Sequence, residues 1–281
     1  MALHMAAVTA QEHEKVIASF FREALSDMTA MDNLEYLCRE AGGRLDGSAA
    51  SRRAVEYTRN AMIRAGADSV WLQKVMVPHW VRGKELCAVQ SPVNGTRNLN
   101  IAALGLSSGT DSTGITAGGI EVHDFEELRQ LGRGRVEGKI VFFNKPVDNT
   151  LINTFEGYGG AVDQRVYGPS EASVLGAEAV IVRSVTQFND DFPHTGVTHY
   201  REGTRQIPAV AVSTAGADLL SGWLRRDPDL RVHLVSACKL QKYFAYHHSA
   251  NDTFEQVNIR ELQLGSAAIA SLVYLIDHFG Y

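Results

Sequence analysis

The segment Lys139-Ile140-Val141-Phe142-Phe143 decides the fold class, because it is a short and almost wholly apolar run in the middle of the chain. Similar runs rich in β-branched and small apolar residues recur on both sides of it and are separated by turns, as is typical of strands. These runs cover residues 115–117, 119–122, 179–182, 208–212 and 231–235. Helices with plausible starts at Asp124, Pro169 and Ser213 lie between them. The pattern predicts a compact, β-rich domain with a few helices over residues 99–238.

Helical patterns lie outside this region on both sides. Apolar residues recur at helical spacing over residues 11–29 and 31–38, and a further good helix covers 48–65. It leads into a strand-like run over 69–77 that Pro78 stops. The last apolar stripe, over 259–278, predicts a helix packed on a sheet. The alternation of helices and strands indicates an α/β protein.

Composition excludes several classes of partner. The 281 residues are 45% hydrophobic and 21% charged, with a net charge of -5 and without a run of Lys and Arg. A protein that binds phosphate backbones or anionic lipid needs a basic surface, so neither nucleic acid nor membrane is expected as a partner.

The cysteines and the N-terminus say little about the compartment. Three widely separated cysteines fit neither a disulfide framework nor a Cys-based zinc site, although one pair could bridge. Residues 1–10 contain no convincing apolar core of a signal peptide. Two glycosylation patterns, Asn94-Gly95-Thr96 and Asn251-Asp252-Thr253, weigh slightly towards a secretory route.

The most informative motif lies between the β-rich region and the last helix. It reads Lys242-Tyr243-Phe244-Ala245-Tyr246-His247-His248-Ser249-Ala250-Asn251-Asp252-Thr253. A histidine after an aromatic strand could present one imidazole to a metal, with Ser249 or Asp252 fixing the loop. A His-His pair is more often a solvated loop, and catalytic zinc generally takes three protein ligands.

This motif, followed by Val257, Asn258 and an Ala-rich helix, resembles the C-terminal end of carboxypeptidase Q-like two-zinc exopeptidases, and the resemblance extends through nearly all of the chain. Segment 42–48 is similar to an early Gly-x-Arg-Leu-x-Gly-Ser turn of that family, and segment 77–83 to the residues before its inserted domain. The segments that resemble the insert itself are 104–106, 138–141, 176–177, 181–185, 193–196 and 206–209.

The resemblance implies an α/β zinc-exopeptidase domain, with helices on a mixed sheet, that carries an inserted β-rich protease-associated domain. It places N-terminal helices and the first part of the peptidase domain in 1–98, the insert in 99–238 and a C-terminal remnant of the peptidase domain in 239–281. It also implies zinc as the cofactor, dipeptides or other short peptides as substrates, a secreted or lysosomal location, and a possible homodimer.

The chain departs from the family where the catalytic segment belongs. In the family a His-x-Asp motif, a bridging Asp, a Glu-Glu pair and a further acidic ligand follow the insert. Here Cys238-Lys239-Leu240 passes directly to Gln241-Lys242-Tyr243-Phe244. Only His248 matches a family metal ligand, and no catalytic residue is carried over. We therefore expect weak or absent zinc binding and no hydrolysis by this chain alone. The alternative function is a non-enzymatic module that binds a peptide or a protein.

Other candidates have plainer explanations. The acidic run His123-Asp124-Phe125-Glu126-Glu127 is expected from capping at a helix start. His194 and His199 could approach a cleft but are more typical of a polar loop. Lys145, Asp163 and Arg165 have no supporting constellation. The Gly-x-Ser-x-Gly spacing of residues 105–109 lacks the helix that a nucleophile elbow requires after Ser107, and predicts a turn.

The missing segment has a consequence for packing. Without the central strands of the family sheet, the helices that begin near Ser48 and Ile259 lose part of the surface that they normally cover. We expect exposed apolar area on both helices, and low stability or aggregation as its consequence.

Overall fold

The computed structural model describes residues 10–45, 47–73, 79–241 and 259–279. The chain divides into two compact units. One consists of Met1–Gly42 with Asp252–Tyr281, and the other of Gly43–Asn251.

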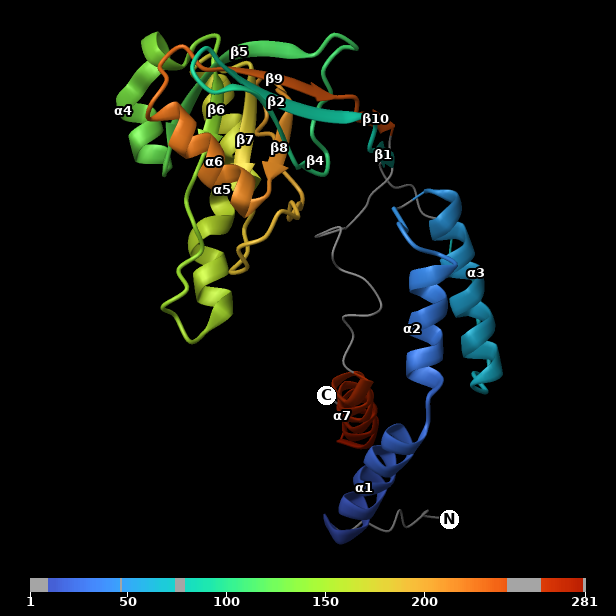
Figure 1. Cartoon of the computed structure of the whole chain (residues 1–281). Coiled ribbons are helices and arrows are strands. Elements are labelled where there is room, and N and C mark those ends of the chain that lie inside the picture. Colours follow the sequence, from blue (N-terminus) through green and yellow to red (C-terminus); the bar gives the residue numbers. More distant parts are fainter. Residues whose placement is uncertain (1–9, 46, 74–78, 242–258, 280–281) are drawn as a thin grey trace. The chain divides into compact units, whose positions relative to one another are not determined.

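The smaller unit is helical and joins the two ends of the chain. Its helices are α1 (Ala10–Ser26), α2 (Thr29–Arg39) and α7 (Ile259–Phe279), and α7 packs against both of the others (Figure 1). Tyr274 anchors the contact, since its hydroxyl lies 3.0 Å from His13 Nδ1 and its ring meets that of Phe20 edge to face. The Gln263 side chain donates a hydrogen bond to the carbonyl of Asp27. The helices predicted over 11–29, 31–38 and 259–278 are thus confirmed, but the predicted packing of the last helix on a sheet is wrong, because α7 packs on α1 and α2.

The larger unit is built on an eight-stranded mixed sheet, and an α-helix, α3 (Ala49–Arg64), precedes it in the chain. Ser48 caps this helix by accepting a hydrogen bond from the Ser51 amide. The strand order is β3-β2-β9-β5-β6-β7-β8-β4. The bounds are Glu85–Ser91 (β2), Gly95–Leu99 (β3), Ile101–Ala103 (β4), Ile115–Val122 (β5), Ile140–Phe143 (β6), Ala179–Arg183 (β7), Ala209–Val212 (β8) and Arg231–Ser236 (β9). A separate two-stranded ladder pairs β1 (His79–Val81) with β10 (Lys239–Gln241).

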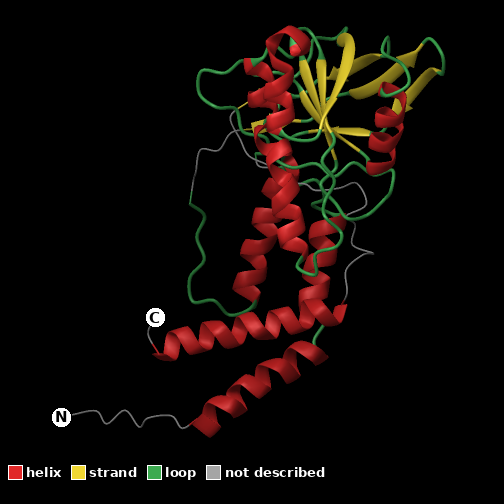
Figure 2. Cartoon of the chain, turned by 90° about the vertical axis from the view of Figure 1, so that its left-hand side faces the viewer, coloured by secondary structure: helices red, strands yellow, loops and turns green. Residues whose placement is uncertain are grey.

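The four central strands β5 to β8 run parallel, and the remaining strands pair antiparallel on either side. Helix α4 (Phe125–Val136) connects β5 to β6, α5 (Thr154–Val174) connects β6 to β7, and α6 (Thr214–Leu224) connects β8 to β9. The connection from β7 to β8 contains no helix. The fold is therefore mixed α/β, with helices beside the strands (Figure 2).

Strand β6 shows how the sheet divides the core into two layers. Ile140 and Phe142 pack with residues of α6 on one face, whereas Val141 and Phe143 pack with residues of α4 and α5 on the other. All four side chains are buried, as expected for a parallel strand that is covered on both faces. The continuous apolar run of residues 140–143 is thus explained by burial on both sides.

Three expectations need correction or stay open. The helix start at Pro169 is wrong: α5 begins at Thr154 behind its cap Asn153, and Pro169 lies inside it. The region before Pro169 escaped notice because three glycines, at 157, 159 and 160, weaken its helical pattern. The strand over 69–77 is absent from residues 69–73, and 74–78 lie outside the described residues. The division at residues 98 and 238 remains a prediction, although β2 already belongs to the large sheet.

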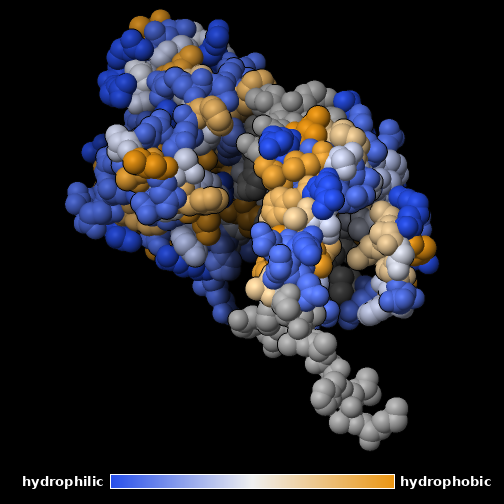
Figure 3. Space-filling view, turned by 90° about the horizontal axis from the view of Figure 1, so that it is seen from below, coloured by the Kyte–Doolittle hydropathy of each residue, from blue (hydrophilic) through white to orange (hydrophobic). Residues whose placement is uncertain are grey.

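Apolar side chains are exposed on the two helices for which this was predicted. They are Val55, Met62 and Ile63 on α3, and Ile259, Ile269, Leu272, Val273 and Ile276 on α7. Figure 3 shows apolar patches on the molecular surface, bordered by hydrophilic residues. No helix in the described part of the chain combines the length and the apolar character that a membrane span requires.

Candidate functional site

Polar side chains gather where the parallel strands end. His123 follows β5, Asn144 follows β6, Arg183 ends β7 and Ser213 follows β8. The registers place the last residues of these strands level with one another, so that the four side chains come to one edge. Ligands of open α/β sheets bind outside this carboxyl edge. The edge is therefore the first place to look for a functional site, and two hollows lie along it.

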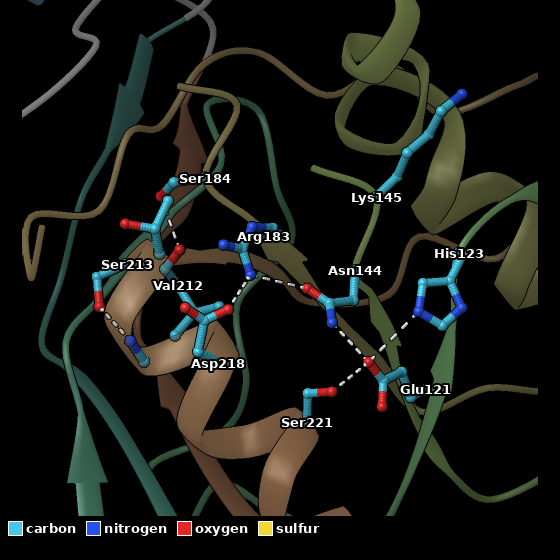
Figure 4. Close-up of polar contacts among 12 residues, drawn as sticks. Glu121, His123, Asn144, Lys145, Arg183, Ser184, Val212, Ser213, Asp218 and Ser221 are labelled. Carbon is cyan, nitrogen blue, oxygen red and sulfur yellow. Dashed lines mark hydrogen bonds and ion pairs between the residues drawn. The ribbon is translucent and has the colours of Figure 1, made fainter. Parts of the chain in front are cut away.

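The first hollow is organised by Glu121, whose side chain is only 12% exposed. Its Oε1 accepts hydrogen bonds from Asn144 Nδ2 at 2.5 Å and from Ser221 Oγ at 2.7 Å. His123 Nε2 lies 3.6 Å from the same oxygen (Figure 4). Three elements, β5, the end of β6 and α6, thus meet at one carboxylate.

Arg183 extends this network on its other side. Its Nη1 donates to Asn144 Oδ1 at 3.2 Å and to Asp218 Oδ1 at 2.7 Å (Figure 4). Arg225 donates to Ser221 Oγ at 2.9 Å. The hollow has a volume of about 400 Å³ and is lined by both charged arginines and by Asp218. Arg183 thus has an acidic partner in Asp218, whereas Arg225 is exposed to solvent and donates to a hydroxyl.

The start of α4 matches the capping interpretation of the acidic run. Asp124 Oδ1 accepts the Glu127 amide at 2.7 Å, and Glu127 Oε2 accepts the His123 amide at 2.7 Å. The same Glu127 oxygen lies 3.0 Å from His123 Nδ1. Asp124 is thus the N-cap of α4, and Glu127 reaches back to the residue before the cap, so both carboxylates are held at the start of the helix.

The second hollow lies between the N-terminal half of α5 and the segment that follows β7. It has a volume of about 460 Å³ and is mostly apolar or aromatic in its lining. The lining residues are Val147, Thr154, Phe155, Tyr158, Arg165, Val185, Thr186, Gln187, Phe188, His194 and Thr195. Nearby in the chain, Gln164 joins α5 to the segment after β6, because its buried amide bonds to both the N–H and the carbonyl of Lys145.

The polar residues that had no supporting motif in the sequence lie at different positions in the structure. Arg165 and His194 line the second hollow, and the His194 amide donates to Ser184 Oγ at 2.8 Å. His199 is exposed and its ring stands edge to face on Tyr167. Asp163 Oδ1 accepts a hydrogen bond from the Gln164 amide. Only Arg165 and His194 are therefore brought to a common site.

Ser107 is not a nucleophile. It is fully buried, its Oγ donates to the Ser108 carbonyl and accepts the Ala209 amide, and no helix follows it. The positive φ of 68° belongs to Leu106 instead. The turn predicted for residues 105–109 is confirmed.

The described residues do not make a zinc centre. No group of three or more His, Cys, Asp or Glu side chains that could hold a metal occurs among them, and His248 lies outside the described residues. All three cysteines are free thiols, and burial raises the pKa of Cys87 to about 12. A metal ligand or nucleophile must be the thiolate, so Cys87 fits neither role.

Known proteins are similar to this chain in sequence and in structure. No family model matches the chain. Carboxypeptidase Q of Bos taurus is 35% identical over 208 residues, which are 74% of this chain and 42% of that protein. Carboxypeptidase Q of Xenopus laevis is 33% identical over 216 residues, 77% of this chain and 42% of its own. A peptidase M28 precursor from Shewanella amazonensis matches the structure with a TM-score of 0.77 at 29% identity, over 83% of this chain and 52% of the other.

The chain belongs to the carboxypeptidase Q-like family. The resemblance stated from the sequence is thus confirmed, and so is the mixed α/β fold, which is that of the peptidase M28 structure. This carboxypeptidase Q-like chain spans less than half the length of the carboxypeptidase Q proteins that it matches. Its curated relatives are carboxypeptidases by name, and the structure that it matches is that of a peptidase.

Sequence reasoning missed the network around Glu121, Asn144 and Arg183. Glu121 and Ser221 lie 100 positions apart, and only the return of α6 to the sheet brings them together. A signal was available, because polar residues directly after buried parallel strands meet at one edge. It could have identified Asn144 and Arg183, but not the partners that α6 supplies.

Proposed function

We propose that this carboxypeptidase Q-like chain carries the substrate-facing, protease-associated portion of a zinc exopeptidase and does not hydrolyse peptides by itself. One observation carries the proposal: only residues 242–247 separate strand β10 from His248. This interval is too short for the His-x-Asp motif, the bridging Asp, the Glu-Glu pair and the further acidic ligand that the resemblance requires. His248 alone cannot hold a catalytic zinc, which generally takes three protein ligands and a water.

The sheet unit is proposed to be the inserted protease-associated domain of the family. In support, its two hollows open at the carboxyl edge of a parallel sheet, where ligands of such folds bind. In a complete enzyme, zinc would polarise the scissile carbonyl and lower the pKa of a bound water. The residues of this chain would then bind and orient a short peptide rather than cleave it.

Hydrolysis of a mixed panel of dipeptides by the purified chain tests this proposal. Zinc is added in one arm and a chelator in the other, and circular dichroism establishes that the protein is folded. We expect no turnover that the chelator abolishes. Chelator-sensitive turnover that disappears in His248→Ala but survives in His199→Ala, a matched exposed histidine, would overturn it.

A second candidate function is a binding module that takes a peptide or a partner protein without catalysis. The two hollows favour it, since both are concave and both present polar side chains near the carboxyl edge of the sheet. Saturable binding of a ligand by protein that shows no turnover distinguishes this candidate from an intact enzyme. A homodimer is also proposed from the resemblance, and light scattering after gel filtration measures it.

A secretory location is proposed on the same resemblance. In support, Asn94 of the Asn94-Gly95-Thr96 pattern lies exposed in the turn between β2 and β3, where a glycan could be attached. Expression in a secreting eukaryotic host should give a glycosidase-sensitive mass that Asn94→Gln reduces. A mass that is unchanged by either treatment would remove this support.

A further inference from the structure

Arg165 is a buried cation at the wall of the larger hollow. Its residue is 6% exposed, and the guanidinium lies 5.5 Å from the centre of the Tyr158 ring. One Nη group bonds to the Tyr158 hydroxyl and the other donates to the Thr195 carbonyl at 3.4 Å. Its Nε has no hydrogen-bond partner among the described residues. The side chain is thus positioned by neutral groups only.

No carboxylate compensates this charge within the described part of the chain. None of the residues that line the hollow is Asp or Glu, and no ion pair joins Arg165 to a described acidic residue. Arginine cannot escape the cost of burial by losing its proton. A buried charge without a counter-charge is costly, and the ring of Tyr158 offsets only a part of that cost.

Gly196 shows how closely the structure fits around this guanidinium. A Cβ atom at position 196 would lie 2.4 Å from Arg165 Cζ, so the backbone there packs directly against the charged group. The contact covers one side of the guanidinium and fixes it against the wall of the hollow. The absence of a side chain at this position keeps the cation in place.

The rest of the hollow is suited to an apolar body. Val147 and Val185 belong to a small buried cluster, and Tyr158 packs against it. Phe155 and Phe188 line the hollow and are 83% and 71% exposed. Exposed aromatic residues beside a concave surface are typical of binding sites, because they lose their contact with water only when a ligand is present.

We propose that this hollow binds a small carboxylate that carries an apolar or aromatic body. The carboxylate provides the counter-charge for Arg165, and Tyr158 and Thr186, which carry hydroxyl groups, also line the hollow. The apolar body covers Phe155 and Phe188. The chemistry is shared by a free arylalkyl carboxylic acid and by the C-terminal residue of a peptide with an apolar side chain.

The site deepens the second candidate function and is independent of hydrolysis. All measurements are therefore made on the full chain in the presence of a chelator. If binding fails here, the present proposal is overturned, whereas the proposal on zinc and hydrolysis is untouched. If turnover were found in the dipeptide assay, this site would still be tested separately.

Isothermal titration with three probes tests the chemistry. 3-Phenylpropionate has both the charge and the ring, 3-phenylpropanol has the ring without the charge, and propionate has the charge without the ring. We expect saturable binding of 3-phenylpropionate, at least about tenfold tighter than that of either other probe, since a charge-assisted contact and apolar burial are both needed. A dipeptide that ends in phenylalanine and its C-terminal amide then separate peptide ends from free acids.

Matched variants locate the site. Arg165→Met should weaken binding of 3-phenylpropionate about tenfold or more, whereas Arg205→Met, at an arginine 53% exposed, should leave it unchanged. Phe188→Ala should weaken binding severalfold, and Phe192→Ala, at an exposed phenylalanine outside the hollow, should not. Phe188 is on the surface, so its variant keeps the test valid even if Arg165→Met does not fold.

Three outcomes overturn the proposal. The first is binding of 3-phenylpropanol as tightly as of 3-phenylpropionate, because the charge of Arg165 would then have no role. The second is binding that neither Arg165→Met nor Phe188→Ala changes, because the ligand would then lie elsewhere. The third is the absence of saturable binding of 3-phenylpropionate.

Discussion

The two hollows at the carboxyl edge of the sheet differ in how completely the charged groups in them are compensated by neighbouring residues. Around Glu121 and Arg183, carboxylates, amides and arginines meet within one network, and each group has a complementary partner. Around Arg165, a cation is buried among hydroxyls, a carbonyl and aromatic rings without an acidic residue. The first arrangement is complete as it stands, whereas the second is completed by an anion. The difference separates a network that stabilises the fold from a site that is prepared for a ligand.

The largest effect is expected at Glu121, where three elements meet. Glu121→Ala leaves Asn144 Nδ2 and Ser221 Oγ without their acceptor. Buried polar groups that lose a charged partner cost stability, and we expect a loss of about 2–3 kcal/mol in the free energy of unfolding. Urea denaturation measures it.

The control for this prediction is Glu126→Ala, at a side chain that is 68% exposed on α4. It should change the free energy of unfolding by less than about 0.5 kcal/mol. Equal effects of the two substitutions would mean that the network does not stabilise the edge, and the contrast between the hollows would then lose its basis.

A smaller effect is expected at Arg183, whose side chain is 14% exposed. Arg183→Met removes the hydrogen bonds to Asn144 and Asp218, but Asp218 is 56% exposed and regains water. We expect a loss of about 1 kcal/mol by urea denaturation. A second substitution at Asn144 should add less than its single effect, since the two residues share one bond.

The smallest expected effect is a pH dependence of stability that comes from Glu85, a partly buried carboxyl whose burial is only partly offset by its neighbours. Burial raises the pKa of Glu85, while the charge of Arg82 and the hydrogen bond from the Ala103 amide lower it to a lesser extent. Its stability contribution is therefore present below the unfolded pKa of about 4.3 and is lost as the pH rises through the raised pKa of the folded state.

Glu85→Gln keeps an acceptor for Ala103 but does not ionise, so the stability lost between about pH 4 and pH 7 should be smaller than in the wild type. Glu126→Gln, which changes an exposed carboxylate, should follow the wild-type curve. Parallel curves for the wild type and Glu85→Gln, measured by urea denaturation across this range, would contradict the prediction.

Local signals predicted much of the fold. The strand at 140–143 was predicted from its apolar run, and the starts of α3, α4 and α6 were predicted because Ser48, Asp124 and Ser213 cap them within a few residues. Each of these features is decided by neighbours along the chain. The hairpin of β2 and β3 was missed, since β3 is polar and mostly exposed.

The site was less predictable because it depends on contacts that are distant in sequence. Arg165 was set aside in the sequence for want of a constellation, although Tyr158 precedes it by seven positions. Residues at that spacing share a helix face, but the helix had been placed after Pro169 instead of after Asn153. Because the helix start was predicted wrongly, the pairing of Tyr158 with Arg165 at the second hollow was not predicted.

The comparison of Arg165→Met with Arg183→Met tests most directly whether the two hollows differ as described. Both substitutions remove an arginine and keep a side chain of similar length, and urea denaturation measures the free energy of unfolding of each. Because the charge of Arg165 has no acidic partner in the described structure, its replacement should be nearly neutral or stabilising, while Arg183→Met should lose about 1 kcal/mol. A loss at Arg165 that equals or exceeds the loss at Arg183 would contradict the account, since the protein itself would then compensate the charge that we assign to a ligand.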